Sequence, residues 1–350
     1  GVWIMSYTNG LDKPSDYFVT KLYSGNGASS HAISGVGFQS DWTWIKNRSA
    51  SLNHALTDSV RSAPLRLMSN ATDGDINQTT GLLSFNSDGF TVGADSGYNG
   101  NGNSIVSWNW KAGTSFTNDA SATGIGSIDS AGSVSDVSGF SICSYTGTGS
   151  NGTVKHGLST APSTIIYKRR NSTSGWVVWH KSLGTGILEL NETGASQGGS
   201  SYTNGTAPTS SVFSIGTSGD INADGGTFVA YAFAPKQGFS KMGSYIGSGS
   251  NSFIHTGFKV GWLLVKVADG TNGWLVIDTK RSPANPQGKF VYANASSAEG
   301  TVTYGEFFSN GFGWKGTGSV AVNQSGEKFI YYAIAENPFV TSTGVPATAR

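Results

Sequence analysis

Short stretches in which apolar and polar residues alternate run along the whole chain, and each ends in a turn rich in Gly, Asn, Ser and Thr. A representative stretch is Phe140-Ser-Ile-Cys-Ser-Tyr145. Alternation with a period of two is typical of strands with one buried face. Turn signals every 8 to 15 residues, as found here, are typical of antiparallel sandwiches. The pattern therefore predicts an all-β protein with almost no helix.

The same landmarks occur three times along the chain of 350 residues. A Tyr-x-Gly-x-Gly turn begins at Tyr23, Tyr145 and Tyr245, and a Lys that ends an apolar strand follows 23, 23 and 21 residues later. Matching spacing at several landmarks is the signature of an internal repeat. The later landmarks are Lys46, Lys168 and Lys266, then His54, Trp176 and Trp274, and finally the strands 106–110, 229–233 and 330–334.

The repeats predict three tandem antiparallel β-sandwich-like modules. Residues 114–137 are almost wholly Gly, Ser, Thr, Ala and Asp, which is typical of an irregular linker, whereas only Pro235-Lys-Gln-Gly238 separates the second copy from the third. We therefore expect a separable first module and a rigid pair made by the other two. A jelly roll and three sheets that share one core are the alternatives. The predicted ranges are 1–113, 138–236 and 237–340 for the modules, 114–137 for the linker and 341–350 for a C-terminal tail.

Charged residues make up 12% of the chain, about half the usual share, and Lys+Arg (22) balance Asp+Glu (21). The sequence has no basic tract that would attract a phosphate backbone or an anionic membrane. Its longest apolar runs have strand length, far below the roughly 20 residues that span a bilayer. We therefore expect no nucleic-acid partner and no membrane insertion. The first residues, Gly1-Val-Trp-Ile4, lack a secretory pattern, so the natural N-terminus stays open.

The residues that could carry metal or thiol chemistry have simpler structural interpretations. Cys143 lies in a strand-like segment and is expected to be a buried, inert thiol. Asp220-Ile-Asn-Ala-Asp-Gly225 matches the opening of a calcium loop, but the twelfth position, where that loop needs a bidentate Glu, is Tyr231. We therefore expect no metal and no cofactor. Histidines that recur before the second strand of each copy lack partners at metal spacing and are expected to hydrogen-bond turns: His31, His156 and His255.

The sequence shows no catalytic constellation. It has no nucleophile elbow, no acidic residue stands in a recognisable frame, and the first copy has no Glu, which excludes a Glu-based chemistry repeated in all copies. Aromatic residues remain as binding candidates, since sugar rings stack on Tyr and Trp. Tyr98, Tyr202 and Trp314 lie in loops outside the repeat, so we predict that they contact a ligand, the alternative being ordinary exposed or interface aromatics. Aromatics at repeated strand positions are predicted to be core: Trp44, Trp110, Trp176, Phe233, Trp274 and Tyr332.

Several short motifs in a fixed order resemble an uncharacterised, repeat-containing domain family found in virion structural proteins of marine bacteriophages, often behind concanavalin-like lectin segments. The resemblance extends from about Tyr17 onward. It implies a location, the phage particle, and brings no catalytic motif with it. The motifs that carry it are 37–48, Phe85-Asn-Ser-Asp-Gly-Phe90, Trp108-Asn-Trp-Lys-Ala-Gly113, His156-Gly-Leu158, Ala335-Glu-Asn-Pro-Phe339 and the closing Gly344-Val-Pro-Ala-Thr-Ala-Arg350.

The leading hypothesis is a non-enzymatic structural protein on the surface of a virion, either a tail fibre or a capsid fibre or decoration. It would contact other virion proteins and present polar loops to glycans or proteins of the host surface. One alternative is a polysaccharide depolymerase with an unrecognised carboxylate pair, and another is a purely architectural capsid or tail protein. A homotrimer is compatible with the low surface charge, but no coiled-coil heptad enforces it.

Overall fold

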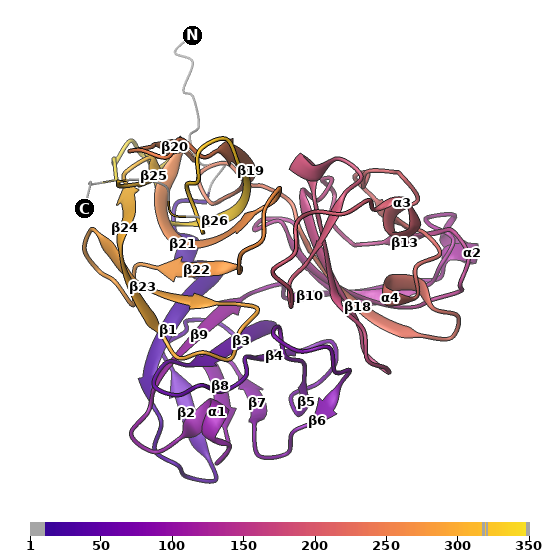
Figure 1. The fold of residues 1–350 in the computed structure, drawn as a ribbon. Coiled ribbons are helices and arrows are strands. Elements are labelled where there is room, and N and C mark those ends of the chain that lie inside the picture. Colours follow the sequence, from indigo (N-terminus) through magenta and orange to yellow (C-terminus); the bar gives the residue numbers. More distant parts are fainter. Residues whose placement is uncertain (1–10, 317–318, 320, 348–350) are drawn as a thin grey trace.

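The computed structural model describes residues 11–316, 319 and 321–347, and these form three lobes around a common centre (Figure 1). We call residues 11–113 lobe 1, residues 114–236 lobe 2 and residues 237–347 lobe 3. Each lobe contains one large antiparallel sheet, as the alternating pattern predicts. The helices of the described residues are single turns. The predicted all-β class is therefore confirmed.

The three large sheets have the following strand orders. The first is β1 (Phe18–Ser24), β9 (Ser104–Trp110), β3 (Trp42–Asn47) and β4 (Ala55–Asp58). The second is β10 (Thr114–Asn118), β11 (Ser130–Ser135), β12 (Phe140–Thr146), β18 (Thr227–Phe233), β14 (Thr164–Arg169), β15 (Trp176–His180) and β16 (Ile187–Glu189). The third is β19 (Ser240–Ile246), β26 (Lys328–Pro338), β21 (Phe258–Val267), β22 (Leu275–Asp278), β23 (Gln287–Tyr292), β24 (Gly300–Phe308), β25 (Gly311–Trp314) and β20 (Ile254–His255).

Smaller elements cover the outer faces of lobes 1 and 2. Lobe 1 adds the sheet β2 (His31–Ser34), β8 (Gly89–Val92) and β7 (Leu82–Asn86) and the pair β5 (Leu65–Arg66) and β6 (Ile76–Asn77), and lobe 2 adds the pair β13 (Gly152–Lys155) and β17 (Val212–Ile215). The helical turns are η1 (Pro14–Asp16), α1 (Ser96–Asn99), α2 (Ala120–Thr123), η2 (Lys181–Leu183), α3 (Ser200–Thr203) and α4 (Gly219–Asn222). Within the described residues, none of these helices has the length and hydropathy needed to cross a membrane.

One four-strand order recurs in all three large sheets. It reads β1-β9-β3-β4 in the first, β12-β18-β14-β15 in the second and β19-β26-β21-β22 in the third. These strands contain the repeated Tyr, Lys and final-strand landmarks, so the sequence repeat corresponds to a repeated topology. The division into three tandem modules with the predicted boundaries stays a prediction. The start Gly1–Ile4 and residues 348–350 of the predicted tail and of its closing motif lie outside the described residues.

The segment 114–137 is not the irregular linker that its composition suggested. It forms β10, the helical turn α2 and β11, and β11 pairs with β12 in antiparallel register from Ser130↔Tyr145 to Ser135↔Phe140. Small hydroxyl residues can occupy a strand when the neighbouring strand supplies the hydrogen bonds and the packing, which composition alone does not reveal. The second sheet is therefore two strands longer at this edge than the repeat requires.

The three large sheets share one hydrophobic core. A single cluster contains buried residues from every lobe. Trp42 stacks on Tyr231 at a ring separation of 4.3 Å, Trp110 meets Trp262 edge to face at 5.6 Å, and Phe233 lies 4.8 Å from Tyr332. Each pair of lobes is thus joined by direct aromatic contact at the centre. The alternative of three sheets around a shared core describes this arrangement better than three independent sandwiches.

Each lobe also has a cluster of its own on the outer face of its sheet. Because strand residues alternate between the two faces, one half of each sheet packs into the shared core and the other half into the private one. All six aromatics predicted to be core lie in the shared cluster and are at most 6% exposed, so that prediction is confirmed: Trp44, Trp110, Trp176, Phe233, Trp274 and Tyr332.

Three lysines at equivalent positions link the lobes in a ring. Each is fully buried, and its Nζ donates hydrogen bonds to carbonyls of its own hairpin and to one carbonyl of another lobe. A buried ammonium group requires such acceptors. Lobe 1 thereby contacts lobe 3, lobe 2 contacts lobe 1, and lobe 3 contacts lobe 2. The contacts between lobes are Lys46 to Ser296 at 3.1 Å, Lys168 to Thr72 at 3.0 Å and Lys266 to Thr193 at 3.2 Å.

Chains of ion pairs, each with one fully buried Arg–Asp pair, reinforce two of the three junctions. Between lobes 1 and 2 the chain runs through Asp58, Arg61, Asp75 and Arg170, with N···O distances of 2.5, 2.7 and 2.9 Å. Between lobes 3 and 1 the equivalent chain runs through Asp278, Arg281, Glu299 and Arg48, at 2.6, 3.4 and 2.7 Å. At the junction of lobes 2 and 3 the corresponding positions are His180, Leu183, Ser196 and Ala268. Lobe 1 was expected to be separable, but both chains of ion pairs connect it to the other lobes.

A fragment truncated to residues 1–113 is expected not to fold cooperatively on its own. Removing lobes 2 and 3 would expose the shared-core face of the first sheet, including Trp42 and Trp110, and would leave Arg48 without Glu299. Circular dichroism during thermal unfolding, with the full chain as the control, tests this. A sharp transition of the fragment near the melting temperature of the full chain would show instead that lobe 1 is an independent domain.

Candidate functional site

Tyr98, one of the three predicted ligand contacts, is a core residue. It lies in α1 and is 1% exposed. Its carbonyl accepts a hydrogen bond from the hydroxyl of Tyr23 at 2.8 Å. In the other lobes Tyr145 and Tyr245 donate in the same way to the carbonyls of Ile221 and Val322, which are also buried. Tyr98 therefore occupies a repeated position, and the expectation that it is an exposed loop aromatic is wrong.

Trp314 is also buried rather than exposed. It ends β25, is 2% exposed, and packs edge to face on Phe312. Its indole Nε1 donates a hydrogen bond to the hydroxyl of Tyr245 at 2.8 Å. The Gly residues around Trp314 in the sequence suggested a loop, but Gly311 and Gly313 lie in β25 with Trp314. The Trp314 ring fills the private core of lobe 3. The Trp314 ring is therefore part of a hydrophobic core, which the sequence did not reveal.

Tyr202 is the predicted aromatic that remains accessible. It lies half-buried in α3, and its hydroxyl donates to the Asp220 carboxylate at 3.4 Å. The other oxygen of Asp220 accepts from the Ser174 hydroxyl at 2.8 Å. Burial, followed by the nearby charges of Asp220 and Glu192, raises the pKa of Glu189 beside this group. The ligand role of Tyr202 stays a prediction.

The segment that resembled a calcium loop serves as a turn support. Asn222 is fully buried, its Oδ1 accepts from the Thr148 amide, and its Nδ2 donates to the carbonyls of Ser150 and Gly216. Asn99 and Asn323 make the same kind of bonds to the corresponding turns. In the described part of the chain, no group of three or more His, Cys, Asp and Glu is arranged to hold a metal ion.

Two of the recurring histidines contact turns. The Nδ1 of His156 accepts from the Leu158 amide at 3.1 Å, while its Nε2 contacts the Thr209 carbonyl at 3.2 Å. His31 contacts the side-chain oxygen of Asn99 at 2.9 Å. His255 is exposed and offers its carbonyl to the Nζ of Lys241. The prediction of a turn-bonding role is confirmed for His156 and His31.

The thiol of Cys143 is expected to resist modification in the native protein. It is fully buried, and burial raises its pKa to about 12, so almost no thiolate exists at neutral pH. Titration with an aromatic disulfide reagent should therefore show no reaction in native buffer and one equivalent in denaturant. Rapid reaction of the native protein would mean that lobe 2 opens readily around β12.

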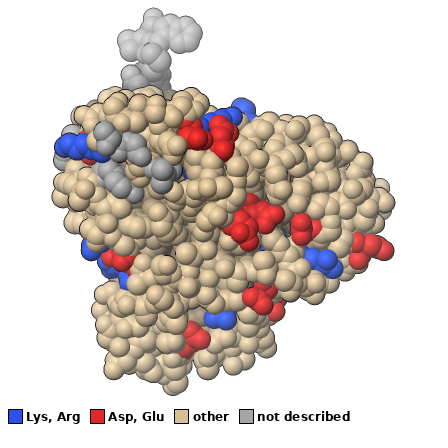
Figure 2. All heavy atoms as spheres, in the orientation of Figure 1, with Lys and Arg blue, Asp and Glu red and all other residues tan. Residues whose placement is uncertain are grey.

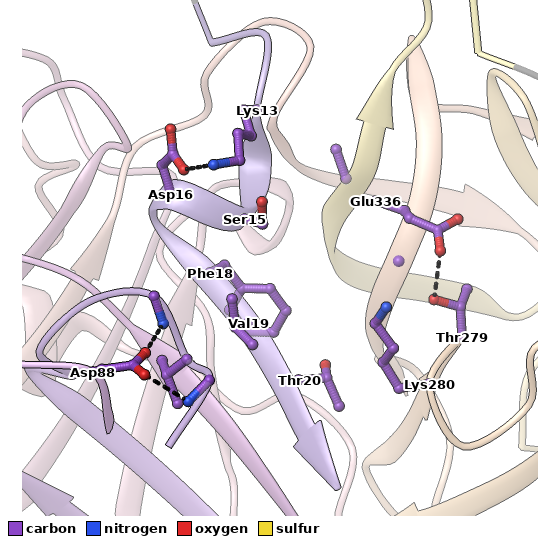
Figure 3. Close-up of a pocket in the computed structure, with 15 residues that line it drawn as sticks. Lys13, Ser15, Asp16, Phe18, Val19, Thr20, Asp88, Thr279, Lys280 and Glu336 are labelled. Carbon is purple, nitrogen blue, oxygen red and sulfur yellow. Dashed lines mark hydrogen bonds and ion pairs between the residues drawn. The ribbon is translucent and has the colours of Figure 1, made fainter. Parts of the chain in front are cut away.

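A cleft between lobes 1 and 3 is a candidate site (Figure 3). It has a volume of about 420 Å³. Strand β1 forms its floor with Phe18, Val19 and Thr20, and the loop Gly35–Gly37 of lobe 1 forms one wall. Lobe 3 supplies the opposite wall from the end of β22 and from β26. The residues of this second wall are Gly261, Thr279, Lys280, Ala335 and Glu336.

Carboxylates and ammonium groups both line the rim of this cleft. Asp88 accepts hydrogen bonds from the amides of Gly35 at 2.9 Å and Gly37 at 2.6 Å, and these bonds lower its pKa. Asp16 pairs with Lys13 at 2.8 Å. Across the cleft, Glu336 accepts from the Thr279 hydroxyl at 3.4 Å. The rim thus carries charged groups of both signs, and strand β1 forms the floor.

A family model described as a domain of unknown function, DUF7483, matches residues 13–338. The chain belongs to this family. No curated protein matches the chain. Among solved structures, the chain is similar to the major capsid protein P2 from bacteriophage PM2, at 9% identity and a TM-score of 0.20, over 55% of this chain and 96% of that one. A TM-score this low does not establish a shared fold.

Two rim residues of this DUF7483 chain lie in motifs that sequence reasoning used only for the family resemblance. Asp88 belongs to Phe85-Asn-Ser-Asp-Gly-Phe90, and Glu336 belongs to Ala335-Glu-Asn-Pro-Phe339. The first motif forms the hairpin turn between β7 and β8, and the second lies at the end of β26. Their distance in sequence hid the fact that the shared core brings lobes 1 and 3 together. Both motifs are visible in the sequence, but only the arrangement of the lobes shows that their acidic residues border the same cleft.

Proposed function

We propose that this chain is a non-enzymatic structural component of a bacteriophage particle, located on its outside as a tail fibre or as a capsid fibre or decoration. Its role there is to hold a fixed shape and to present polar loops to neighbouring virion proteins and to glycans or proteins of the host surface. The order of motifs that resembles phage virion proteins supports the location. The shared core supports the structural role.

The observation that carries the proposal is the interlocking of the three lobes. Aromatic stacking, three buried lysines and two chains of ion pairs connect every lobe to the others. Such a body resists deformation because no lobe can move without breaking buried polar contacts. Rigidity of this kind suits a part that transmits load or keeps a spacing in a particle.

The surface of the molecule also suits an extracellular particle. Figure 2 shows a face that is mostly uncharged, with acidic side chains gathered in a few small groups. Surface ion pairs are screened strongly at high ionic strength, so a protein that depends on buried packing keeps its stability there. The polar loops rich in Gly, Ser, Thr and Asn provide hydrogen-bond donors and acceptors without a strong field.

Quantitative mass spectrometry of gradient-purified, salt-washed particles tests the proposed location. We expect the chain in a fixed number of copies per particle, many for a capsid decoration and few for a tail fibre. Its absence from washed particles, with the major capsid protein as the internal standard, would contradict the proposal.

Substitution of Tyr202, the accessible aromatic, tests the proposed binding to the host surface. Labelled protein is expected to bind host cells, and Tyr202→Ala is expected to weaken that binding while the neighbouring change Ser201→Ala leaves it intact. Equal binding of both variants would remove Tyr202 from the proposal, and no binding by the unmodified chain would leave the purely architectural role.

A depolymerase remains the rival function, and one observation indicates where to look. Burial and, after it, the nearby charge of Asp220 raise the pKa of Glu189, and a general acid needs a raised pKa. Release of reducing ends from host polysaccharide, lost in Glu189→Gln, would establish that activity. The proposed structural role predicts no release by either protein.

A further inference from the structure

Strand β1 is an open edge of the first sheet. The sheet order begins at β1, and its next neighbour, β9, pairs with it from Phe18↔Trp110 to Ser24↔Ser104. Tyr17 accepts from the Lys111 amide and the Gly25 amide donates to Asn103, which fixes the alternation of the hydrogen bonds. The odd-numbered residues therefore bond to β9, and the amides and carbonyls of Phe18, Thr20 and Leu22 point outward.

The same edge is covered in the second sheet. Strand β12, the equivalent of β1, pairs on its outer side with β11. The strand that β11 covers is more deeply buried than β1. Ile142 and Cys143 of β12 are fully buried, whereas the corresponding Thr20 and Lys21 of β1 are only half-buried. An exposed edge is a template for another strand, and proteins normally protect it.

The cleft between lobes 1 and 3 occupies the place that β10 and β11 occupy between lobes 2 and 1. The turn after β22, with Thr279 and Lys280, corresponds to the turn after β4, with Ser59 and Val60, since both follow an Asp whose carboxylate pairs with an Arg three residues later. At the junction of lobes 1 and 2, Ser59 and Val60 face β10 and β11 across a cavity of about 440 Å³. At the junction of lobes 3 and 1, Thr279 and Lys280 face the open floor of the cleft (Figure 3).

The third equivalent strand, β19, also ends its sheet, and its residues Ser240 and Lys241 line a cavity of about 520 Å³. At the junction of lobes 2 and 3, the helical turn η2 lies against β19, and the Nζ of Lys328 donates to the carbonyl of Ser182. Of the three equivalent strands, β12 is therefore paired with another strand on its outer edge, β19 is contacted by a helical turn, and β1 borders the cleft.

We propose that the cleft along β1 binds an extended segment of a neighbouring protein subunit, which adds to the first sheet as an antiparallel strand. The segment would take the position that β11 takes on β12 and would bond to the outward amides and carbonyls of Phe18, Thr20 and Leu22. Main-chain hydrogen bonds of this kind provide affinity, and the walls of the cleft provide selectivity. This proposal goes beyond the proposed virion role, because it specifies the contact by which the chain would bind a partner.

The chemistry of the segment follows from the strand that fills the equivalent place. Strand β11 reads Ser-Ala-Gly-Ser-Val-Ser, and a Cβ added at Gly132 would lie only 1.8 Å from the carbonyl oxygen of Ile142. The cleft of 420 Å³ also lies between two close walls, and its rim carries both signs of charge. An extended segment rich in Ser, Ala, Gly and Thr, with little charge of its own, therefore fits best.

The test uses a capped synthetic peptide with the sequence of residues 128–137, which contains β11, and the full chain. We expect the peptide to bind and to slow hydrogen exchange at the amides of Phe18, Thr20 and Leu22. Thr20→Pro removes one outward amide while it keeps the bonds to β9, because the Thr20 amide points away from that strand. This change is expected to weaken binding by about tenfold or more.

Two further variants keep the result interpretable. Ser244→Pro places the same residue in the equivalent strand β19 and is expected to leave peptide binding unchanged. Ser15→Trp fills the cleft from an exposed position of its rim and is expected to block binding even if Thr20→Pro folds poorly. Undetectable binding by the unmodified chain, or equal binding by Ser15→Trp, would overturn the proposal. Either result is independent of whether the chain is present in phage particles.

Discussion

Arg61→Met is expected to lower the free energy of unfolding by about 3–5 kcal/mol. The Arg61 guanidinium and the Asp58 carboxylate are both fully buried and lie 2.5 Å apart, and the Tyr231 hydroxyl of lobe 2 also donates to Asp58 at 2.7 Å. Methionine fills similar volume but leaves the carboxylates of Asp58 and Asp75 without their shared cation. Chemical denaturation at neutral pH measures the change.

The equivalent position at the junction of lobes 2 and 3 supplies the control. There the residue is Leu183, so Leu183→Met exchanges one apolar side chain for another and should cost less than about 1.5 kcal/mol. A second variant, Asp58→Asn combined with Arg61→Met, should recover part of the loss because less uncompensated charge stays buried. A cost for Arg61→Met as small as that for Leu183→Met would show that the ion chain does not hold lobes 1 and 2 together.

The protein is expected to lose stability as the pH falls from about 6.5 to about 4. Burial lowers the pKa of His54 to about 3 and the pKa values of His156 and His180 to about 4. Each Nδ1 accepts a hydrogen bond, from the Trp44 indole, the Leu158 amide and the Ser182 amide respectively, so a proton there would set two donors against each other.

The sign follows from proton binding in the two states. Unfolded histidine takes up its proton near pH 6.5 and the folded groups do so only near pH 3 to 4, so acid favours the unfolded state throughout that interval. At pH 5 the loss is on the order of 2 kcal/mol for each histidine. Denaturation midpoints at pH 7.5 and pH 5 measure it, and His180→Gln, which cannot titrate, should show a smaller difference. Equal midpoints at both values would contradict these histidines being buried and neutral.

The repeated strands and their core aromatics could be predicted because they depend on local alternation and on spacing. Trp176 and Trp274 follow a Lys by eight residues in an apolar run, and this pattern is sufficient to place them in a core. What spacing could not predict is that the cores are joined. Whether the inner face of a sheet meets a second sheet of its own module or the sheets of two other lobes does not change the alternation within a strand.

The burial of the three repeated lysines also could not be predicted from the pattern within one repeat. Lys46, Lys168 and Lys266 were visible as landmarks, yet a Lys at the end of a strand normally reaches solvent. Their repetition at one position was the signal that could have identified a buried role. The carbonyls that receive them belong partly to other lobes, so their contacts could not be derived from any single repeat.

The prediction of Tyr98 as a ligand contact failed because a variable segment hid its repeated position. Tyr98 has Ile221 and Val322 as counterparts, but the chain between the landmarks differs in length and composition, so Tyr98 appeared to be unique. The linker prediction failed for a related reason, since residues 114–137 gain their strand structure from β12 rather than from their own side chains. The same edge, uncovered in lobe 1, forms the floor of the candidate site.

A cryo-EM reconstruction of the intact particle tests the central claim most directly, that this chain is a rigid structural part on the outside of a phage. The account predicts density at the outer surface of the capsid or tail into which the three lobes fit as one body, with their relative positions unchanged. Particles that lack this density, or density in which the lobes lie apart along a fibre, would contradict it.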